Sequence, residues 1–161
     1  MNQRIAICAG SFDPPTLGHL NIIERGLRIF DSLIVAVANN TTKQNILGVS
    51  ERVTLLKELL KGHKNVEVTS FEGLLVDFAQ ARRVTTLLRG IRNMSDYEYE
   101  SQMALVNKAL HPEMETIFMV TEGKYSHLRS TFIREILASG GSCKGMIHPG
   151  VEKKLKEKFA K

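Results

Sequence analysis

Apolar positions along the chain follow two alternating patterns. Short runs that are apolar throughout predict buried strands, whereas segments with apolar residues three and four positions apart predict amphipathic helices. Runs of the first kind predict strands over residues 4–9, 33–38, 66–70, 85–88 and 116–120. Because a helical segment separates each run from the next, the pattern is typical of a parallel sheet covered by helices.

The predicted helices each show an apolar face or a recognisable end signal. The first predicted helix has Leu20, Ile23, Leu27 and Phe30 on a single face. The next three cover residues 50–60, 74–82 and 95–110. A fifth runs from Ser130 or Thr131 to Gly140, and the last covers 151–159. Ser50 is expected to cap the second helix, and Ser95 with Glu98 has the spacing of a capping box. Within 74–82, the side chains expected to face inward are Leu74, Leu75, Phe78 and Ala79.

The composition fits one domain over residues 1–161, since 43% of the residues are hydrophobic. Apolar runs fall short of the ~20 residues that span a bilayer, and the chain opens on a strand rather than a signal peptide, so we expect a cytoplasmic protein. Cys8 and Cys143 form no CxxC pair, which favours buried, reduced thiols. The five histidines lack ligand spacing, so we expect no metal held by the protein.

The net charge of +5 suits an anionic partner, but it does not separate nucleic acid, a membrane surface and small polyanions. The segment 151–159 mixes lysines with glutamates and spaces Val151, Leu155 and Phe159 by four, which favours the solvated face of a helix over a nucleic-acid patch. Other basic residues fall in or beside predicted loops, namely Lys43, Arg89, Arg92 and Arg129. Loops at strand ends are where open α/β sheets bind ligands.

Residues 10–19, with the sequence GSFDPPTLGH, join the first predicted strand directly to the first helix. The first N–H groups of a helix lack partners and carry partial positive charge, so a phosphate could bind at this turn. Gly18 allows a ligand close to the backbone, and His19 adds a donor. A lone histidine in such a loop would more often cap or pack, and Asp13 beside two prolines is interpreted as a turn-forming residue.

Two strings within this turn, GSFD at 10–13 and TLGH at 16–19, resemble the T/HxGH signature of the nucleotidyltransferase superfamily, which includes class I aminoacyl-tRNA synthetases. Further segments follow the other predicted strands: Lys43, then LLRGIR at 87–92 with DYEYE at 96–100, then YSHLRST at 125–131 with Arg134. With these, nearly the whole chain resembles the bacterial phosphopantetheine adenylyltransferases, and RGIRNMSDYEYE is the most specific part. The resemblance implies a Rossmann-like, doubly wound sheet of five parallel strands flanked by helices, and a homohexamer.

The resemblance also implies the activity: transfer of AMP from ATP to 4'-phosphopantetheine with magnesium, giving dephospho-coenzyme A and pyrophosphate in coenzyme A biosynthesis. Dephospho-coenzyme A or coenzyme A would then bind as product or inhibitor. A phosphate monoester is already an anionic nucleophile, so positioning and charge neutralisation must carry the catalysis. By the same resemblance His19 is catalytic, and the acceptor is bound by Ser11, Lys43, Leu75 and Arg89. The implied nucleotide-binding residues are Gly10, Ser11, Phe12, Gly18, His19, Gly90, Ile91, Arg92, Glu100, Tyr125, Ser126, His127, Leu128, Arg129, Ser130 and Thr131.

Some positions depart from the pattern of these enzymes. Arg129 stands where a serine is usual, and Asn45 and Leu47 replace a proline and a phenylalanine. We expect Arg129 to add a contact to the triphosphate, the alternative being an outward surface arginine. Two other functions stay open: a nicotinamide mononucleotide adenylyltransferase or cytidylyltransferase, and a non-catalytic nucleotide or nucleic-acid binding module. The sequence lacks a helix-turn-helix or aromatic RNA-binding motif, so neither nucleic acid nor a membrane is expected as a partner.

Overall fold

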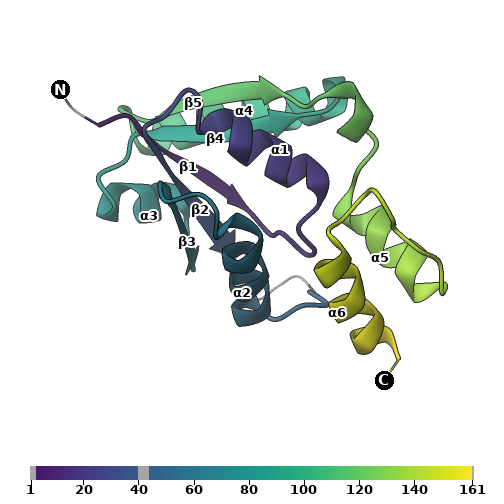
Figure 1. Cartoon of the computed structure of the whole chain (residues 1–161). Helices are drawn as coiled ribbons and strands as arrows, with labels where there is room; N and C mark the ends of the chain where they lie inside the picture. Colours follow the sequence, from purple (N-terminus) through teal and green to yellow (C-terminus); the bar gives the residue numbers. More distant parts are fainter. Residues whose placement is uncertain (1–2, 40–43, 161) are drawn as a thin grey trace.

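Five parallel strands form one sheet in the order β3-β2-β1-β4-β5, with helices on both faces (Figure 1). The computed structural model describes residues 3–39 and 44–160. The strands are β1 (Ile5–Gly10), β2 (Ser32–Ala38), β3 (Val66–Phe71), β4 (Thr86–Ile91) and β5 (Glu115–Val120). The helices are α1 (Leu17–Gly26), α2 (Val49–Leu60), α3 (Leu75–Ala81), α4 (Met94–Leu110), the short 3₁₀ helix η1 (Gly123–Tyr125), α5 (Ser130–Ala138) and α6 (Pro149–Phe159). The predicted fold class and the predicted order of strands and helices are confirmed.

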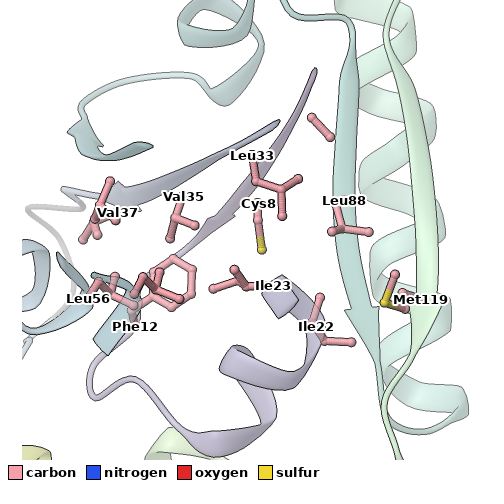
Figure 2. Close-up of a cluster of buried hydrophobic side chains, with 13 residues drawn as sticks. Cys8, Phe12, Ile22, Ile23, Leu33, Val35, Val37, Leu56, Leu88 and Met119 are labelled. Atoms are coloured by element: carbon pink, nitrogen blue, oxygen red, sulfur yellow. The ribbon is translucent and has the colours of Figure 1, made fainter. Parts of the chain in front are cut away.

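The central strands are apolar throughout because both of their faces are covered. Along β1, Ala6 and Cys8 point into a cluster with α1 and α2, whereas Ile7 and Ala9 point into a cluster with α3 on the opposite face. Figure 2 shows the first cluster, in which the ring of Phe12 closes the end nearest the β1–α1 turn. This packing fixes α1, and with it the turn over residues 10–19, against the sheet.

A third apolar cluster joins α5 and α6 to α2 instead of to the sheet (Figure 1). Ile133 and Leu137 of α5 pack with Val151 and Leu155 of α6, and Leu47 and Leu55 complete the cluster. The lysines of α6 therefore lie on the solvated side of the helix, as the spacing predicted. Among the described residues, no helix is both long and apolar enough to cross a membrane.

Three predicted details of the helices are wrong. Gly48 instead of Ser50 precedes α2, because the Glu51 carboxylate accepts the Gly48 N–H at 2.9 Å. Asn93 caps α4, since its Oδ1 accepts the Asp96 N–H at 2.9 Å, so Ser95 lies inside the helix. Leu74 precedes the first turn of α3 and is 55% exposed, and the α3 residues that are fully buried are Val76 and Ala79.

β4 is also longer than predicted. Its pairing with β5 continues to the end, where Ile91 lies opposite Val120. Arg89 and Gly90 are therefore strand residues rather than loop residues. Because a strand alternates its side chains between faces, this extension determines the direction in which Arg89 points.

Candidate active site

A cavity of about 380 Å³ opens where the order of the strands reverses, between the carboxyl ends of β1 and β4. Such switch points are where open α/β sheets bind ligands. Most residues implied for the nucleotide line this cavity: Gly10, Ser11, Phe12, Gly18, His19, Gly90, Arg92, Glu100, Leu128, Arg129, Ser130 and Thr131. Segments far apart in the sequence thus meet around one space.

A second cavity, of about 310 Å³, adjoins the first and shares part of its wall. The residues that line both cavities are Ala9 and Gly10 at the end of β1, Ser11 directly after it, Arg89 and Glu100. Leu75, the residue implied to contact the pantetheine arm, lines the second cavity with apolar neighbours such as Phe71 and Met103. Two ligands, one in each cavity, would meet at Ser11 and Arg89.

His19 is fixed by a capping box at the start of α1. The Thr16 N–H donates to Nδ1 of His19 at 3.0 Å, and the His19 N–H donates to the Thr16 hydroxyl at 3.3 Å. Because Nδ1 accepts this bond, the neutral ring carries its proton on Nε2. The ring also contacts Phe12 edge-on, at 5.1 Å between centroids. Phe12 adopts φ 49°, a left-handed conformation rare outside glycine, which places its ring in the core beneath His19.

Burial, together with the smaller effect of the positive charges of Arg92 and Arg89, lowers the pKa of His19 to about 4. At neutral pH the imidazole is therefore uncharged and offers an N–H donor instead of a cation. A neutral donor can strengthen its hydrogen bond as negative charge develops on a bound oxygen, without repelling the arginines beside it.

Arg89 is oriented by Glu100 of α4. Its Nε donates to Oε2 at 2.7 Å, its Nη2 donates to Oε1 at 2.5 Å, and its Nη1 donates to the carbonyl oxygen of Ala9. Burial disfavours the charged form, but the bonds and charge of Glu100 outweigh this and hold the pKa of Arg89 above its usual value. Three of the five N–H groups are thereby used, so the cation is held rigidly at the junction of the two cavities.

Arg92 connects the end of β4 to the loop that precedes α5. Its Nε and Nη2 donate to the two carboxylate oxygens of Asp96 at 2.7 and 3.1 Å, and its Nη1 donates to the carbonyl oxygen of Leu128 at 2.8 Å. Burial raises the pKa of Asp96, but the bonds and charge of Arg92 dominate and leave the pKa below its usual range. Asp96 therefore remains ionised and holds the guanidinium at the cavity wall.

The start of α5 forms the opposite wall. The Ser130 hydroxyl donates to the carbonyl oxygen of Pro14 at 2.9 Å, which joins α5 to the β1–α1 turn. Arg129 is the residue before the helix, lines the nucleotide cavity, and lies 5.7 Å from the centroid of the Phe132 ring. Its stacking on a half-exposed ring is compatible with either expectation for this residue.

The remaining implied residues do not line the first cavity. Ile91 packs into the core. Tyr125, Ser126 and His127 are not among the lining residues, although the Tyr125 backbone approaches Gly18, which does line the cavity. Lys43 lies outside the residues that the structure describes. Across 3–39 and 44–160, no three His, Cys, Asp or Glu side chains are grouped so as to hold a metal ion.

Sequence reasoning missed two charged residues near the site. Asp13 is more than a turn former, because its buried carboxylate accepts bonds from two backbone amides and from Arg134. Arg52 of α2 is equally buried and donates to three carbonyl oxygens. Charged residues beside prolines or on an amphipathic helix usually face water, so the pattern held no signal for either role.

Comparison with known proteins gives consistent results for sequence and fold. Residues 7–136 match a family model described as cytidylyltransferase-like. The chain is 46% identical over 159 residues to a phosphopantetheine adenylyltransferase of Geotalea daltonii, covering 99% of each chain. It is 48% identical to proteins of the same name from Caldanaerobacter subterraneus subsp. tengcongensis and Carboxydothermus hydrogenoformans, covering 99% of this chain and 99% and 98% of theirs.

A solved structure from Vibrio parahaemolyticus, provisionally assigned as a nicotinate-nucleotide adenylyltransferase, superposes with a TM-score of 0.72. The match covers 98% of this chain and 95% of that one, at 22% sequence identity. At this identity the likeness bears on the fold alone, and it agrees with the doubly wound sheet.

Proposed function

The chain belongs to the phosphopantetheine adenylyltransferase family of the nucleotidyltransferase superfamily, and we propose that its two joined cavities bind the two substrates of that reaction. The enzyme transfers AMP from ATP to 4'-phosphopantetheine, giving dephospho-coenzyme A and pyrophosphate in coenzyme A biosynthesis. ATP occupies the cavity beside His19, and the acceptor occupies the cavity lined by Leu75. The observation that carries this proposal is the shared wall of Ser11 and Arg89, where two phosphates can meet.

The chemistry at this wall follows from the charges present. A phosphate oxygen of the acceptor attacks the α-phosphorus of ATP, the bond to the bridging oxygen breaks, and pyrophosphate leaves with the electron pair. The acceptor phosphate is already ionised, so the protein supplies alignment and positive charge instead of a strong base. Arg89 neutralises repulsion between the two anions, and the Ser11 hydroxyl donates to the acceptor phosphate.

His19 acts on the growing charge. Its neutral Nε2–H donates to an oxygen of the α-phosphate, and this bond strengthens as the transition state forms. Arg92, Arg129 and the first amides of α5 would hold the β- and γ-phosphates. Gly18, at the start of α1, leaves the helix amides open to the same phosphates.

Magnesium enters, in this proposal, as the complex with ATP. Mg²⁺ at such sites is held mainly by substrate phosphates and water, and it would neutralise part of the triphosphate charge. We assign it no ligand among the described residues. Free coenzyme A and dephospho-coenzyme A, which carry the acceptor arm and a nucleotide, would compete for both cavities as product or inhibitor.

A homohexamer is part of the proposal, supported by an uncovered apolar face on α4 and β5. Among the described residues α4 buries none of its side chains, and its exposed apolar members include Tyr99, Leu105 and Val106. Val120, at the end of the edge strand β5 that contacts α4, is 70% exposed. An apolar face of this extent on a single chain is typical of an interface. We further propose a cytoplasmic location, which suits two free, buried cysteines.

The choice of acceptor tests the function directly. Purified protein with ATP and magnesium is offered 4'-phosphopantetheine, nicotinamide mononucleotide or glycerol phosphate while pyrophosphate release is measured. We expect 4'-phosphopantetheine to give far more pyrophosphate, because only it carries a phosphate on an apolar, amide-bearing arm. Unphosphorylated pantetheine serves as the control and should be inert, since it lacks the nucleophile. Equal turnover with nicotinamide mononucleotide would contradict the proposal.

A further inference from the structure

Three charged side chains lie together behind the turn that carries Ser11 and His19. Asp13 and Arg52 are each only 1% exposed. The third, Arg134 of α5, forms an ion pair with Asp13, with 3.0 Å between its Nη1 and Asp13 Oδ2. Removing a charge from water costs on the order of several kcal/mol, and a well-packed apolar group often stabilises a fold as well as a buried ion pair does. A contribution to stability alone therefore does not explain why these three charged side chains lie together behind the turn.

The Asp13 carboxylate connects three segments of the chain. Its Oδ2 accepts the Ile46 N–H at 2.9 Å and an Arg134 N–H at 3.0 Å, and its Oδ1 accepts the Leu47 N–H at 3.0 Å. The turn after β1 is thereby bonded to the residues that lead into α2 and to the middle of α5. Both oxygens are occupied, so the carboxylate has one orientation.

Arg52 makes a complementary set of bonds to carbonyl oxygens. Its Nε donates to Leu47 at 3.0 Å, and its Nη1 donates to Ala38 at 3.1 Å and to Ser11 at 2.6 Å. One guanidinium thus holds the end of β2, the residues before α2 and the backbone of Ser11. A planar, rigid group of donors fixes these three positions relative to one another.

The segments joined in this way carry the walls of both cavities. Ser11 lines both, Asn45 beside Ile46 lines the acceptor cavity, and Ser130 at the start of α5 lines the nucleotide cavity. Ser130 also bonds to Pro14, so α5 meets the β1–α1 turn at two points. The charged cluster is the place where the acceptor side and the nucleotide side of the site are connected.

We propose that Asp13, together with Arg52 and Arg134, is a positioning residue that sets the acceptor and nucleotide cavities at the separation required for in-line transfer. The inference rests on the proposed function, because it concerns the alignment of those two substrates. In such reactions an error of about 1 Å in alignment can cost roughly a hundredfold in rate. When the cluster is broken, each substrate still binds to its own cavity, but the acceptor phosphate is no longer aligned with the α-phosphorus of ATP.

The substitution Asp13→Asn tests this. It preserves size, removes the charge that faces Arg134, and places an NH₂ group against one of the two backbone amides. We expect kcat to fall at least about tenfold, while the dissociation constants of ATP and 4'-phosphopantetheine, each measured alone by calorimetry, change less than about threefold. Arg134→Gln should lower kcat in the same direction, and Arg134→Lys, which retains a cation opposite Asp13, should restore most of it.

Asp31→Asn is the matched control. Asp31 also accepts a backbone N–H and pairs with an arginine, Arg4, but it lies before β2, at the end of the sheet away from the site. The Asp31→Asn variant should keep the wild-type kcat, and a lower melting temperature is the largest effect that we expect. The inference is overturned if Asp13→Asn lowers stability but retains the wild-type kcat per folded molecule. If that variant does not fold, Arg134→Gln decides by the same criterion. A wild-type protein that fails to adenylylate 4'-phosphopantetheine would instead overturn the proposed function.

Discussion

His19 lies in an environment that suppresses its positive charge. The Thr16 N–H occupies Nδ1, the Phe12 ring covers one edge, and two arginines stand nearby. The same contacts that make the ring a poor base make it a well-oriented donor. This combination suits a reaction in which charge appears on an oxygen only in the transition state.

His19→Ala should therefore affect turnover much more than binding. We expect kcat to fall by roughly a hundredfold or more, the usual consequence of losing one such donor, with a much smaller change in the dissociation constant of ATP. Steady-state kinetics and calorimetry on the same preparation measure the two effects. Circular dichroism should show an unchanged fold, since the ring contributes only one face to the core. Normal turnover by this variant would remove the catalytic assignment.

The depressed pKa of His19 also predicts how stability depends on pH. The folded protein holds this ring at a pKa of about 4, against an ordinary value of 6.5, so between these values the unfolded chain binds the proton more strongly. The contribution of His19 to stability is complete above pH 6.5 and is lost as the pH falls toward 4. Urea unfolding at about pH 7.5 and about pH 4.5 should show a larger loss for the wild type than for His19→Gln, which does not titrate. Equal losses would contradict the assigned pKa.

At the scale of elements, α1 is packed against the sheet through a glycine. A Cβ at Gly26 would lie 2.6 Å from Leu88 Cδ2, closer than such carbon atoms approach, and 3.0 Å from Leu33 Cδ1, which is a tight contact. The last turn of α1 therefore lies directly on β2 and β4, and this contact fixes the helix whose other end carries His19.

Gly26→Ala should destabilise the protein although alanine favours helices by about 1 kcal/mol. Overpacking of this kind costs about 1–3 kcal/mol, measurable by urea unfolding. Gly62→Ala is the control, because a Cβ there meets nothing within 4 Å, and it should change stability by less than about 0.5 kcal/mol. Unaltered stability of Gly26→Ala would show that α1 can move away from the sheet.

The start of α5 gives a second prediction at this scale. If Arg129 contacts the triphosphate, Arg129→Ser should weaken ATP binding and reduce its dependence on salt, because one charge is removed from the site. Calorimetric titrations at several ionic strengths measure both. An unchanged dissociation constant at every ionic strength would show that the guanidinium serves the Phe132 ring alone.

At the scale of the whole molecule, the apolar face of α4 and β5 should be covered by other copies of the chain. Light scattering should give about six times the 18.0 kDa of one chain. Leu105→Glu places a charge on a side chain that is 71% exposed in this face and should produce smaller species. Ile29→Glu, at an exposed apolar position outside the face, should leave the assembly intact. A stable monomer of the wild type would contradict the proposed hexamer.

The sequence by itself determined the order of elements, the fold class and the family. Apolar runs such as 33–38 are buried on both faces, and a strand of this kind can hardly be placed elsewhere than inside a parallel sheet. Local chemistry also determined the turn over residues 10–19, since a capped helix start is built from neighbours in the chain. The predicted end of β4 is wrong because pairing with β5 extends the strand to Ile91. The predicted starts of α2 and α4 are wrong because the side chains of Glu51 and Asn93 accept the N–H groups there.

Only the tertiary structure decided which side chains meet. The bonds between Arg89 and Glu100 span 11 residues, and those between Asp13 and Arg134 span 121. No periodicity encodes such distances. Asp13 and Arg52 have the polarity of surface residues, and they are buried because carbonyl and amide groups from separate loops converge on them in the fold. The sequence predicted which residue types the chemistry needs, whereas the packing of the sheet, α2 and α5 determined how they are aimed.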